Sequence, residues 1–231
     1  MSFAASTFAQ HEAFHDLSPE YLRLSEIDVR VPCFYTMGSL GQLARTLQKP
    51  HQLFVHSSHG HDTQDDVSIL QNKQPNFAVS LSSFYAHQPQ TSLMLTNTIN
   101  ERIGLSRIRK MQILTCLQEA IVNAVVHGNL GIECRCESLG EFHAYHQQIN
   151  EALGNSQLAE LRVYIKAWDY GSSLQLCVRH QGPGRLDSDK VYESHPSLEQ
   201  KSGRGLYIIQ SLAEQVWSND SGKSLYITFS Y

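Results

Sequence analysis

The 231-residue sequence lacks several features that would assign a protein to a broad functional class. Its 18 Lys and Arg residues stand against 22 Asp and Glu residues, and the resulting net charge of −4 offers no positive field for nucleic acid or anionic lipid. Its apolar runs, such as residues 124–126 and 206–209, are far shorter than the roughly 18 residues that cross a bilayer. These absences favour a protein that binds neither nucleic acid directly nor a membrane.

The amino terminus has neither a basic start nor a long apolar centre, so the sequence predicts no secretory signal. The chain has an odd number of cysteines, at Cys33, Cys116, Cys134, Cys136 and Cys177. An odd number without a signal favours reduced thiols and a cytoplasmic location. Cys134 and Cys136 have no second close pair to complete a structural zinc site, so we expect none.

Residues 1–74 are the less regular part of the sequence and form a poorly defined N-terminal region. Residues 22–31 and 40–47 are compatible with a strand and a helix. Residues 56–62 contain three histidines and one aspartate, which we interpret as a polar loop. A metal site is the alternative interpretation of these side chains.

Residues 65–70, with the sequence Asp-Asp-Val-Ser-Ile-Leu, resemble the closing strand of bacterial PP2C-type serine phosphatases. In that family a paired-aspartate element binds divalent metal. The resemblance implies a phosphatase remnant in the N-terminal region, and it makes a metal-dependent phosphatase based on Asp65 and Asp66 a third hypothesis for function. The family also uses an Asp-Gly dipeptide as a metal ligand, and the chain contains none, so we do not expect an active phosphatase.

Residues 75–231 have the regular periodicity of a folded domain. Alternating apolar residues predict strands at 77–81, 161–167, 174–178 and 225–229. Spacings of three and four residues predict helices at 92–103, 106–128, 139–153 and 205–216. The order of helices, hairpin, helix and hairpin predicts an α+β fold with helices on one face of a mostly antiparallel sheet. On the longest helix, one buried stripe is predicted from Ile108, Met111, Leu114, Leu117, Ile121 and Val125.

The longest predicted helix also carries the first candidate chemical group. Glu119, Asn123 and His127 are spaced by four residues, so they fall along one stripe of the helix. The amide oxygen of Asn123 is a suitable ligand for Mg²⁺, which prefers oxygen. Glu119 can accept a proton from an attacking hydroxyl or water. The alternative is that these polar residues simply face solvent.

Two glycine-rich segments follow later in the chain. Gly182-Pro-Gly184 comes directly after a predicted strand, and Gly203-Arg-Gly205 leads into the last predicted helix. Glycines ahead of a helix expose backbone N–H groups to an anion, and the helix dipole adds to the attraction. Gly203 and Gly205 are therefore candidate phosphate ligands, and an ordinary loop before a helix is the alternative. The polar residues 185–202 between the two segments fit a mobile lid or an exposed loop.

In this order, Glu119 with Asn123, Gly182-x-Gly184 and Gly203-Arg-Gly205 resemble the N, G1 and G2 boxes of the GHKL (Bergerat-fold) ATPases. Within these, the chain is similar to bacterial anti-sigma-factor serine kinases, whose longer members also carry an insertion like residues 132–160. The resemblance implies a two-layer α/β sandwich over residues 75–231, with ATP between helices and lid. The short lid and the lack of a phosphoacceptor-histidine helix pair argue against a two-component histidine kinase.

The resemblance also implies roles for single residues. Glu119 would be the catalytic base that activates a serine hydroxyl on a protein substrate, and Asn123 would hold Mg²⁺. The residues implied in ATP binding are Asn123, His127, His180, Gly182, Gly184, Gly203, Arg204, Gly205 and Leu206. The substrate of the family is a STAS-domain anti-anti-sigma protein, and a second partner is often a sigma factor. Related domains often form homodimers, so a homodimer is among the expected assemblies.

The G1 box departs from the family at its first position. His180 stands where the family has an aspartate whose carboxylate accepts a hydrogen bond from the adenine amino group, and Arg185 replaces the usual aromatic residue. Loss of one charge-assisted hydrogen bond costs about 1.5–3 kcal/mol, or roughly ten- to a hundredfold in affinity. Two hypotheses therefore remain: an ATP- and Mg²⁺-dependent protein serine kinase of a partner-switching system, and a non-catalytic module of the same fold that sequesters a regulator.

Overall fold

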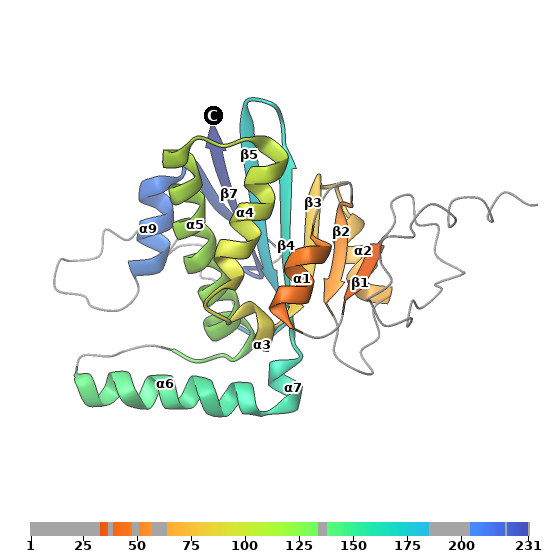
Figure 1. Cartoon of the computed structure of the whole chain (residues 1–231). Helices are drawn as coiled ribbons and strands as arrows, with labels where there is room; N and C mark the ends of the chain where they lie inside the picture. The colour runs from red at the N-terminus through yellow and green to blue at the C-terminus, as the bar shows by residue number, and fades with distance from the viewer. Residues whose placement is uncertain are drawn as a thin grey trace, which may run out of the picture.

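The computed structural model describes residues 33–36, 39–47, 51–56, 64–133, 138–184, 204–219 and 221–230. One layer is a seven-stranded sheet with the order β1-β2-β3-β4-β5-β7-β6 (Figure 1). The strands are β1 (Cys33–Thr36), β2 (Leu53–His56), β3 (Phe77–Ser82), β4 (Arg162–Asp169), β5 (Ser173–His180), β6 (Gln215–Asn219) and β7 (Ser224–Ser230). The pairs β1–β2 and β2–β3 are parallel, and all pairs from β3 to β6 are antiparallel.

Helices pack on both faces of this sheet. They are α1 (Leu40–Thr46), α2 (Gln64–Gln71), α3 (Ser83–Ala86), α4 (Thr91–Ile103), α5 (Arg107–Val122), α6 (Leu139–Gly154), α7 (Ser156–Ala159) and α9 (Arg204–Leu212), with a π-helix η1 (Asn123–Asn129). Helices α1, α4, α5 and α9 cover one face of the sheet, and α6 runs along one end of the domain (Figure 1). The predicted α+β fold with a mostly antiparallel sheet is confirmed. None of the helices in the described parts of the chain is long and apolar enough to cross a bilayer.

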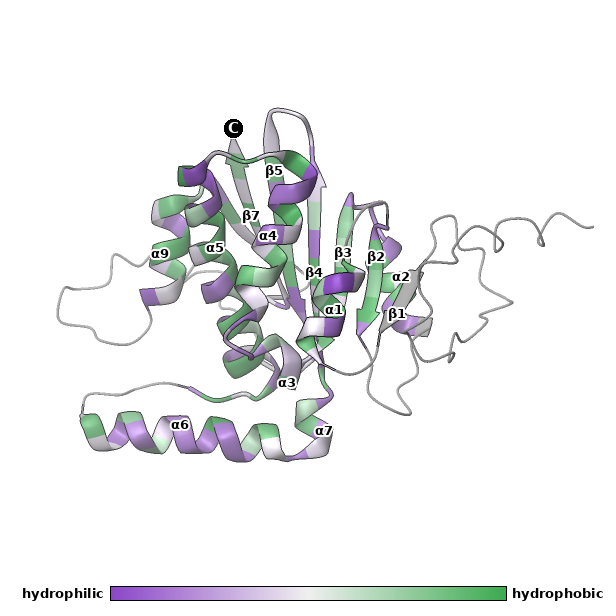
Figure 2. Ribbon diagram, in the orientation of Figure 1, coloured by the Kyte–Doolittle hydropathy of each residue, from purple (hydrophilic) through white to green (hydrophobic). Residues whose placement is uncertain are grey.

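The core lies between the sheet and this helical layer. The strand register places Val79, Ile165, Val178 and Leu225 in one row across β3, β4, β5 and β7. All four side chains are buried. Apolar residues of α1, α4, α5 and α9 pack against this row, and Figure 2 shows the hydrophobic sides of these helices. Period-two alternation therefore placed the inward-facing residues of these strands correctly.

The predicted buried stripe on α5 is wrong at its N-terminal end. The helix begins after Ser106, whose side chain accepts a hydrogen bond from Arg109 N. Ile108 is 74% exposed and Met111 is 56% exposed, whereas Ile113 is fully buried. Each three-residue step falls about 60° short of a full helical turn, so three such steps carry the predicted row half-way around the helix.

The last predicted helix is too long. Helix α9 ends at Leu212, and the chain then forms β6, which pairs with β7. Ala213 N still donates to Ile209 O at 2.9 Å, but Glu214 N donates to Thr228 O across the sheet at 2.9 Å. Pairing with β7 satisfies the backbone beyond Leu212, so the strand replaces the last expected helical turn.

The predicted strand at residues 65–70 is helix α2 instead. Asp65 and Asp66 lie in its first turn, where the helix dipole favours negative charge. Val67 and Leu70 are fully buried and pack against the sheet face opposite the main helical layer. The Asp-Asp element is thus the start of a helix that packs on the sheet, rather than a closing strand.

The outward-facing side chains of β4 hold the segment of α2 by polar contacts. Arg162 and Tyr164 contact Asp66, Lys166 donates to the carbonyls of Ile69 and Asn72, and Trp168 donates to the carbonyl of Lys73. The Arg162 Nε to Asp66 Oδ2 distance is 3.2 Å, and the Tyr164 hydroxyl donates to Asp66 Oδ1 at 2.8 Å. These contacts join α2 to the sheet. The sheet itself is continuous here, because β2 pairs directly with β3.

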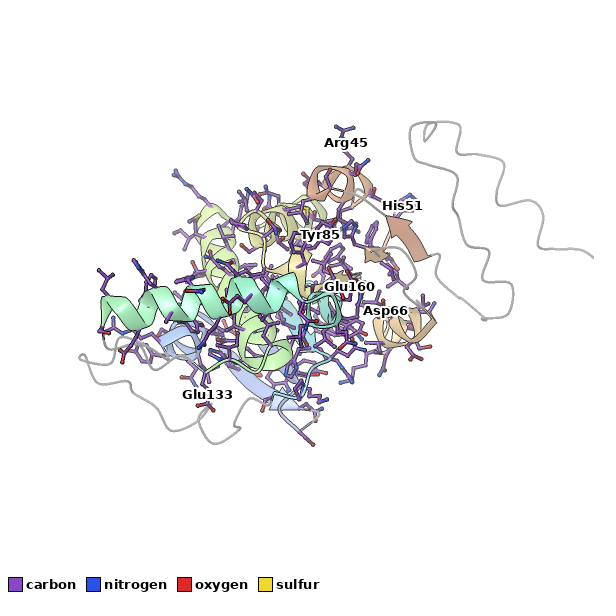
Figure 3. The ribbon with its side chains drawn as sticks, turned by 90° about the horizontal axis from the view of Figure 1, so that it is seen from below. Arg45, His51, Asp66, Tyr85, Glu133 and Glu160 are labelled. Atoms are coloured by element: carbon purple, nitrogen blue, oxygen red, sulfur yellow. The ribbon has the colours of Figure 1, made fainter. Side chains whose placement is uncertain are left out.

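This use of Asp66, which is labelled in Figure 3, argues against the phosphatase hypothesis. Its carboxylate is buried and faces a guanidinium, where a metal cation would be repelled. Among the described residues, no group of three or more His, Cys, Asp or Glu side chains is placed to hold a metal ion.

Some predictions lie outside the described residues. They concern the predicted strand at 22–31, most of the histidine-rich stretch, Cys134 and Cys136.

Candidate functional site

The candidate site begins where helix α5 changes into the π-helix η1. Residues Asn123–Asn129 form this wider turn, and Leu130 N still donates to Val125 O at 2.8 Å. π-helical turns are rare and occur frequently at functional sites. Gly128 and Asn129 at its end are buried beside the start of the loop that follows β5.

Glu119 and Asn123 meet the first turn of α9. A Cβ atom added at Gly205 would lie 2.5 Å from Glu119 Oε2 and 3.6 Å from both side-chain atoms of the Asn123 carboxamide. Cys116, one turn before Glu119, approaches Ile209 O with its Sγ at 3.9 Å. The structure therefore brings together Glu119, Asn123 and Gly205, three residues that the sequence analysis assigned to one site.

The environment of Glu119 changes its acidity. The side chain is half-buried between α5 and α9, and this desolvation raises the pKa of Glu119. A carboxylate with a raised pKa is a stronger base than an exposed one. The geometry thus suits proton acceptance at this position.

His127 is held at the edge of the site by the backbone. Its Nδ1 lies 2.6 Å from the carbonyl oxygen of Ile132. A carbonyl only accepts hydrogen bonds, so Nδ1 carries the proton. This contact ties the end of η1 to the segment that leads towards α6, and the proposed role of His127 in nucleotide binding stays a prediction.

Gly182 and Gly184 pack directly against η1. A Cβ at Gly184 would lie 1.9 Å from His127 O, and one at Gly182 would lie 2.4 Å from Asn129 Cα. Gly184 N also donates to Gly128 O at 2.9 Å. These glycines let the loop after β5 lie on the π-helix, and the room that they would give to adenosine stays a prediction.

Asn129 is a residue of this region that the sequence analysis did not single out. Its Oδ1 accepts from the backbone N–H groups of Gln181 at 3.0 Å and Gly182 at 2.7 Å. Its Nδ2 donates to Ser83 Oγ at 2.8 Å and to Arg162 O at 3.1 Å. One buried carboxamide therefore joins η1, the loop after β5, α3 and β4. The sequence feature that could have identified Asn129 is its position directly after a His-Gly pair at the end of a predicted helix.

His180 is buried beneath η1. It is 1% exposed, and a Cβ at Gly128 would lie 2.4 Å from its Cγ. Burial lowers the pKa of His180 to about 4, with a smaller opposing effect from the backbone of Gly222, so the ring is neutral at pH 7. Neither ring nitrogen has a hydrogen-bond partner of normal geometry within the described parts of the chain.

The start of α9 is described from Arg204 onward. Arg204 is exposed, while Gly205 and Leu206 are half-buried. Gly203 and the segment expected to form the lid lie outside the described residues. The N-terminal N–H groups of α9 thus begin beside Glu119 and Asn123, where a helix terminus attracts an anion.

These residues fit ATP with Mg²⁺. Asn123 offers a carboxamide oxygen to the cation, and the start of α9 offers N–H groups to phosphates. The buried nitrogens of His180 are polar atoms that a nucleotide base would satisfy. The described residues therefore include groups that fit the cation and the phosphates.

Comparison with known proteins also indicates an ATPase domain. A search of curated proteins found no match. Residues 85–229, which form more than half of the chain, match the family model for the histidine kinase-like ATPase domain. The matched residues run from α3 to β7 and include η1, the loop after β5 and the start of α9. The chain therefore belongs to the histidine kinase-like ATPase domain family.

Proposed function

We propose that the chain is an ATP- and Mg²⁺-dependent protein serine kinase. It would act as an anti-sigma-type regulator of a partner-switching system and phosphorylate a STAS-domain antagonist. The observation that carries the proposal is the meeting of Glu119 and Asn123 at Gly205. The matched family is also typical of anti-sigma-factor serine kinases.

In this proposal, Asn123 holds Mg²⁺ through its amide oxygen, and the first N–H groups of α9 hold the phosphates. Bound Mg²⁺ supplies the positive charge that offsets the charge of the transferred phosphoryl group. Glu119 takes the proton of the substrate serine as the serine oxygen bonds to phosphorus and the bond to ADP breaks. The raised pKa of Glu119 supports this role.

We also propose that His180, whose ring nitrogens have no hydrogen-bond partner of normal geometry among the described residues, contacts the adenine base. A neutral imidazole offers one acceptor nitrogen and no negative charge, in contrast to a carboxylate. We therefore expect the chain to bind adenine more weakly than a relative that carries aspartate at this position. The loss of one charge-assisted hydrogen bond corresponds to about ten- to a hundredfold in affinity.

A second candidate is the non-catalytic module that sequesters a regulator. It is favoured by the close packing of His180 against Gly128 and of Gly205 against Glu119. Under this alternative the fold is kept for protein binding, and complex formation does not depend on nucleotide.

Phosphoryl transfer tests the proposal directly. The chain is incubated with γ-labelled ATP, Mg²⁺ and each purified STAS-domain protein encoded by the same genome. We expect one STAS protein to gain label on serine, and EDTA to abolish the labelling. Stable complex formation with a STAS protein, without labelling and without an effect of ATP, would favour the sequestering module instead.

A further inference from the structure

The face of α5 that leads to Glu119 carries exposed apolar side chains. Ile108 is 74% exposed and Met111 is 56% exposed, and both lie in the first two turns of the helix. Apolar side chains gathered on one face are typical of protein interaction sites. We call Ile108, Met111 and Thr115 the α5 face.

Helical geometry connects this face to the site. Ile108 and Glu119 are eleven residues apart, which is close to three turns at 3.6 residues per turn, so they point in nearly the same direction. Thr115 lies one turn before Glu119 in the same row. At 1.5 Å per residue, Ile108 is about 16 Å from Glu119 along the helix axis. A protein that lies along this face therefore reaches Glu119.

The basic residues beside the α5 face lie at a helix end where positive charge does not stabilise the helix. Arg107, Arg109 and Lys110 all lie at the N-terminal end of α5, and its first turn holds no acidic residue. Positive charge at a helix N-terminus is disfavoured by the helix dipole. Arg109 has an internal role, because it donates to Gln112 and lies over the ring of Phe229.

Arg107 and Lys110 thus border the apolar α5 face with positive charge. Such a border is complementary to carboxylates on a partner and steers its association.

We propose that the α5 face is the docking surface for the protein substrate of the proposed kinase. The inference rests on the proposed function and adds the chemistry of the partner. The partner presents apolar side chains bordered by carboxylates, and its phosphorylated serine lies about 16 Å from the side chains that contact Ile108.

The test uses the full chain with the double substitution Ile108→Glu and Met111→Glu. Acidic residues are favourable near a helix N-terminus, so α5 should form normally. The matched control is Leu139→Glu, because Leu139 is also 74% exposed and begins α6. The probe is the purified STAS protein that wild type labels, and the readouts are KM and kcat for this protein together with the affinity for ATP.

We expect the double variant to raise KM for the STAS protein at least tenfold and to leave ATP affinity unchanged. The Leu139→Glu control should match wild type. A double variant with wild-type KM would overturn the docking surface while the kinase assignment stands. If wild type binds ATP but labels no STAS protein, the proposed function and the docking surface both fail.

Discussion

Replacing Glu119 with glutamine is expected to lower the rate of phosphoryl transfer by about 10²–10⁴-fold. Glutamine has nearly the shape of glutamate, so it should fit beside Gly205, but it cannot take the serine proton. Nucleotide affinity should change little, because the base acts in the chemical step. The measurement is single-turnover labelling of the STAS protein at saturating ATP.

The pH dependence of the wild-type rate gives a second test of the role of Glu119 as a base. Glu119 acts as a base only when it is deprotonated, so the rate should fall as pH decreases through its pKa. Burial raises this pKa above the ordinary value of 4.5, so the fall should begin at a higher pH than for an exposed glutamate. Glu101→Gln, the same change at an exposed glutamate of α4, is the control and should keep the wild-type rate. Equal rates for Glu119→Gln and wild type would remove Glu119 from the base role.

The substitution Asp66→Ala should lower the free energy of unfolding by about 3–5 kcal/mol, as expected when one partner of a buried ion pair is removed. Asp66 and Arg162 are both almost fully buried, and their side chains lie 3.2 Å apart. Burial lowers the pKa of Arg162, and Asp66 opposes this decrease. Without Asp66, the guanidinium would remain buried and keep only the weaker attraction of Glu160, and Tyr164 would lose its acceptor.

Asp65→Ala is the matched control for this prediction. Asp65 lies in the same first turn of α2 but is exposed, so both variants lose the same favourable charge at the helix N-terminus. Urea denaturation should show a loss of about 0.3–1 kcal/mol for Asp65→Ala. If the two variants lose equal stability, the Asp66–Arg162 pair does not hold α2 to the sheet.

The sequence predicted the strands and helices that depend on local periodicity. The strands with buried inner faces alternate strictly, and the structure places their inward-facing residues Val79, Ile165 and Val178 in one row. The predicted helix ends at residues 103 and 106 are also correct to within one residue, and single residues cap them. Gly104 ends α4 in the left-handed conformation at φ 77°, and Ser106 begins α5.

Features that depend on distant contacts escaped the sequence analysis. Helix α2 is held to the sheet by Arg162 and Tyr164, about a hundred residues later in the chain, so the six residues by themselves resembled a strand. Strand β6 forms because its backbone pairs with that of β7. For Ile108 the reason is different, because three-residue steps drift around a helix and the pattern has no fixed face.

The candidate site was predicted in part. Sequence order identified Glu119, Asn123 and Gly205, and the structure brings them into contact. The π-helix, the four hydrogen bonds of Asn129 and the packing of His180 under Gly128 all arise from tertiary contacts between separate segments. No spacing rule for a regular helix anticipates them.

Calorimetric titration with ATP, in Mg²⁺ and in EDTA, tests the central claim most directly. For wild type we expect binding that is tighter in Mg²⁺ than in EDTA. For Asn123→Ala we expect this difference to disappear while the affinity in EDTA is retained, because only the cation ligand is removed. No binding heat at millimolar ATP, or an unchanged Mg²⁺ effect in Asn123→Ala, would contradict the claim that Asn123 and the start of α9 hold a magnesium nucleotide.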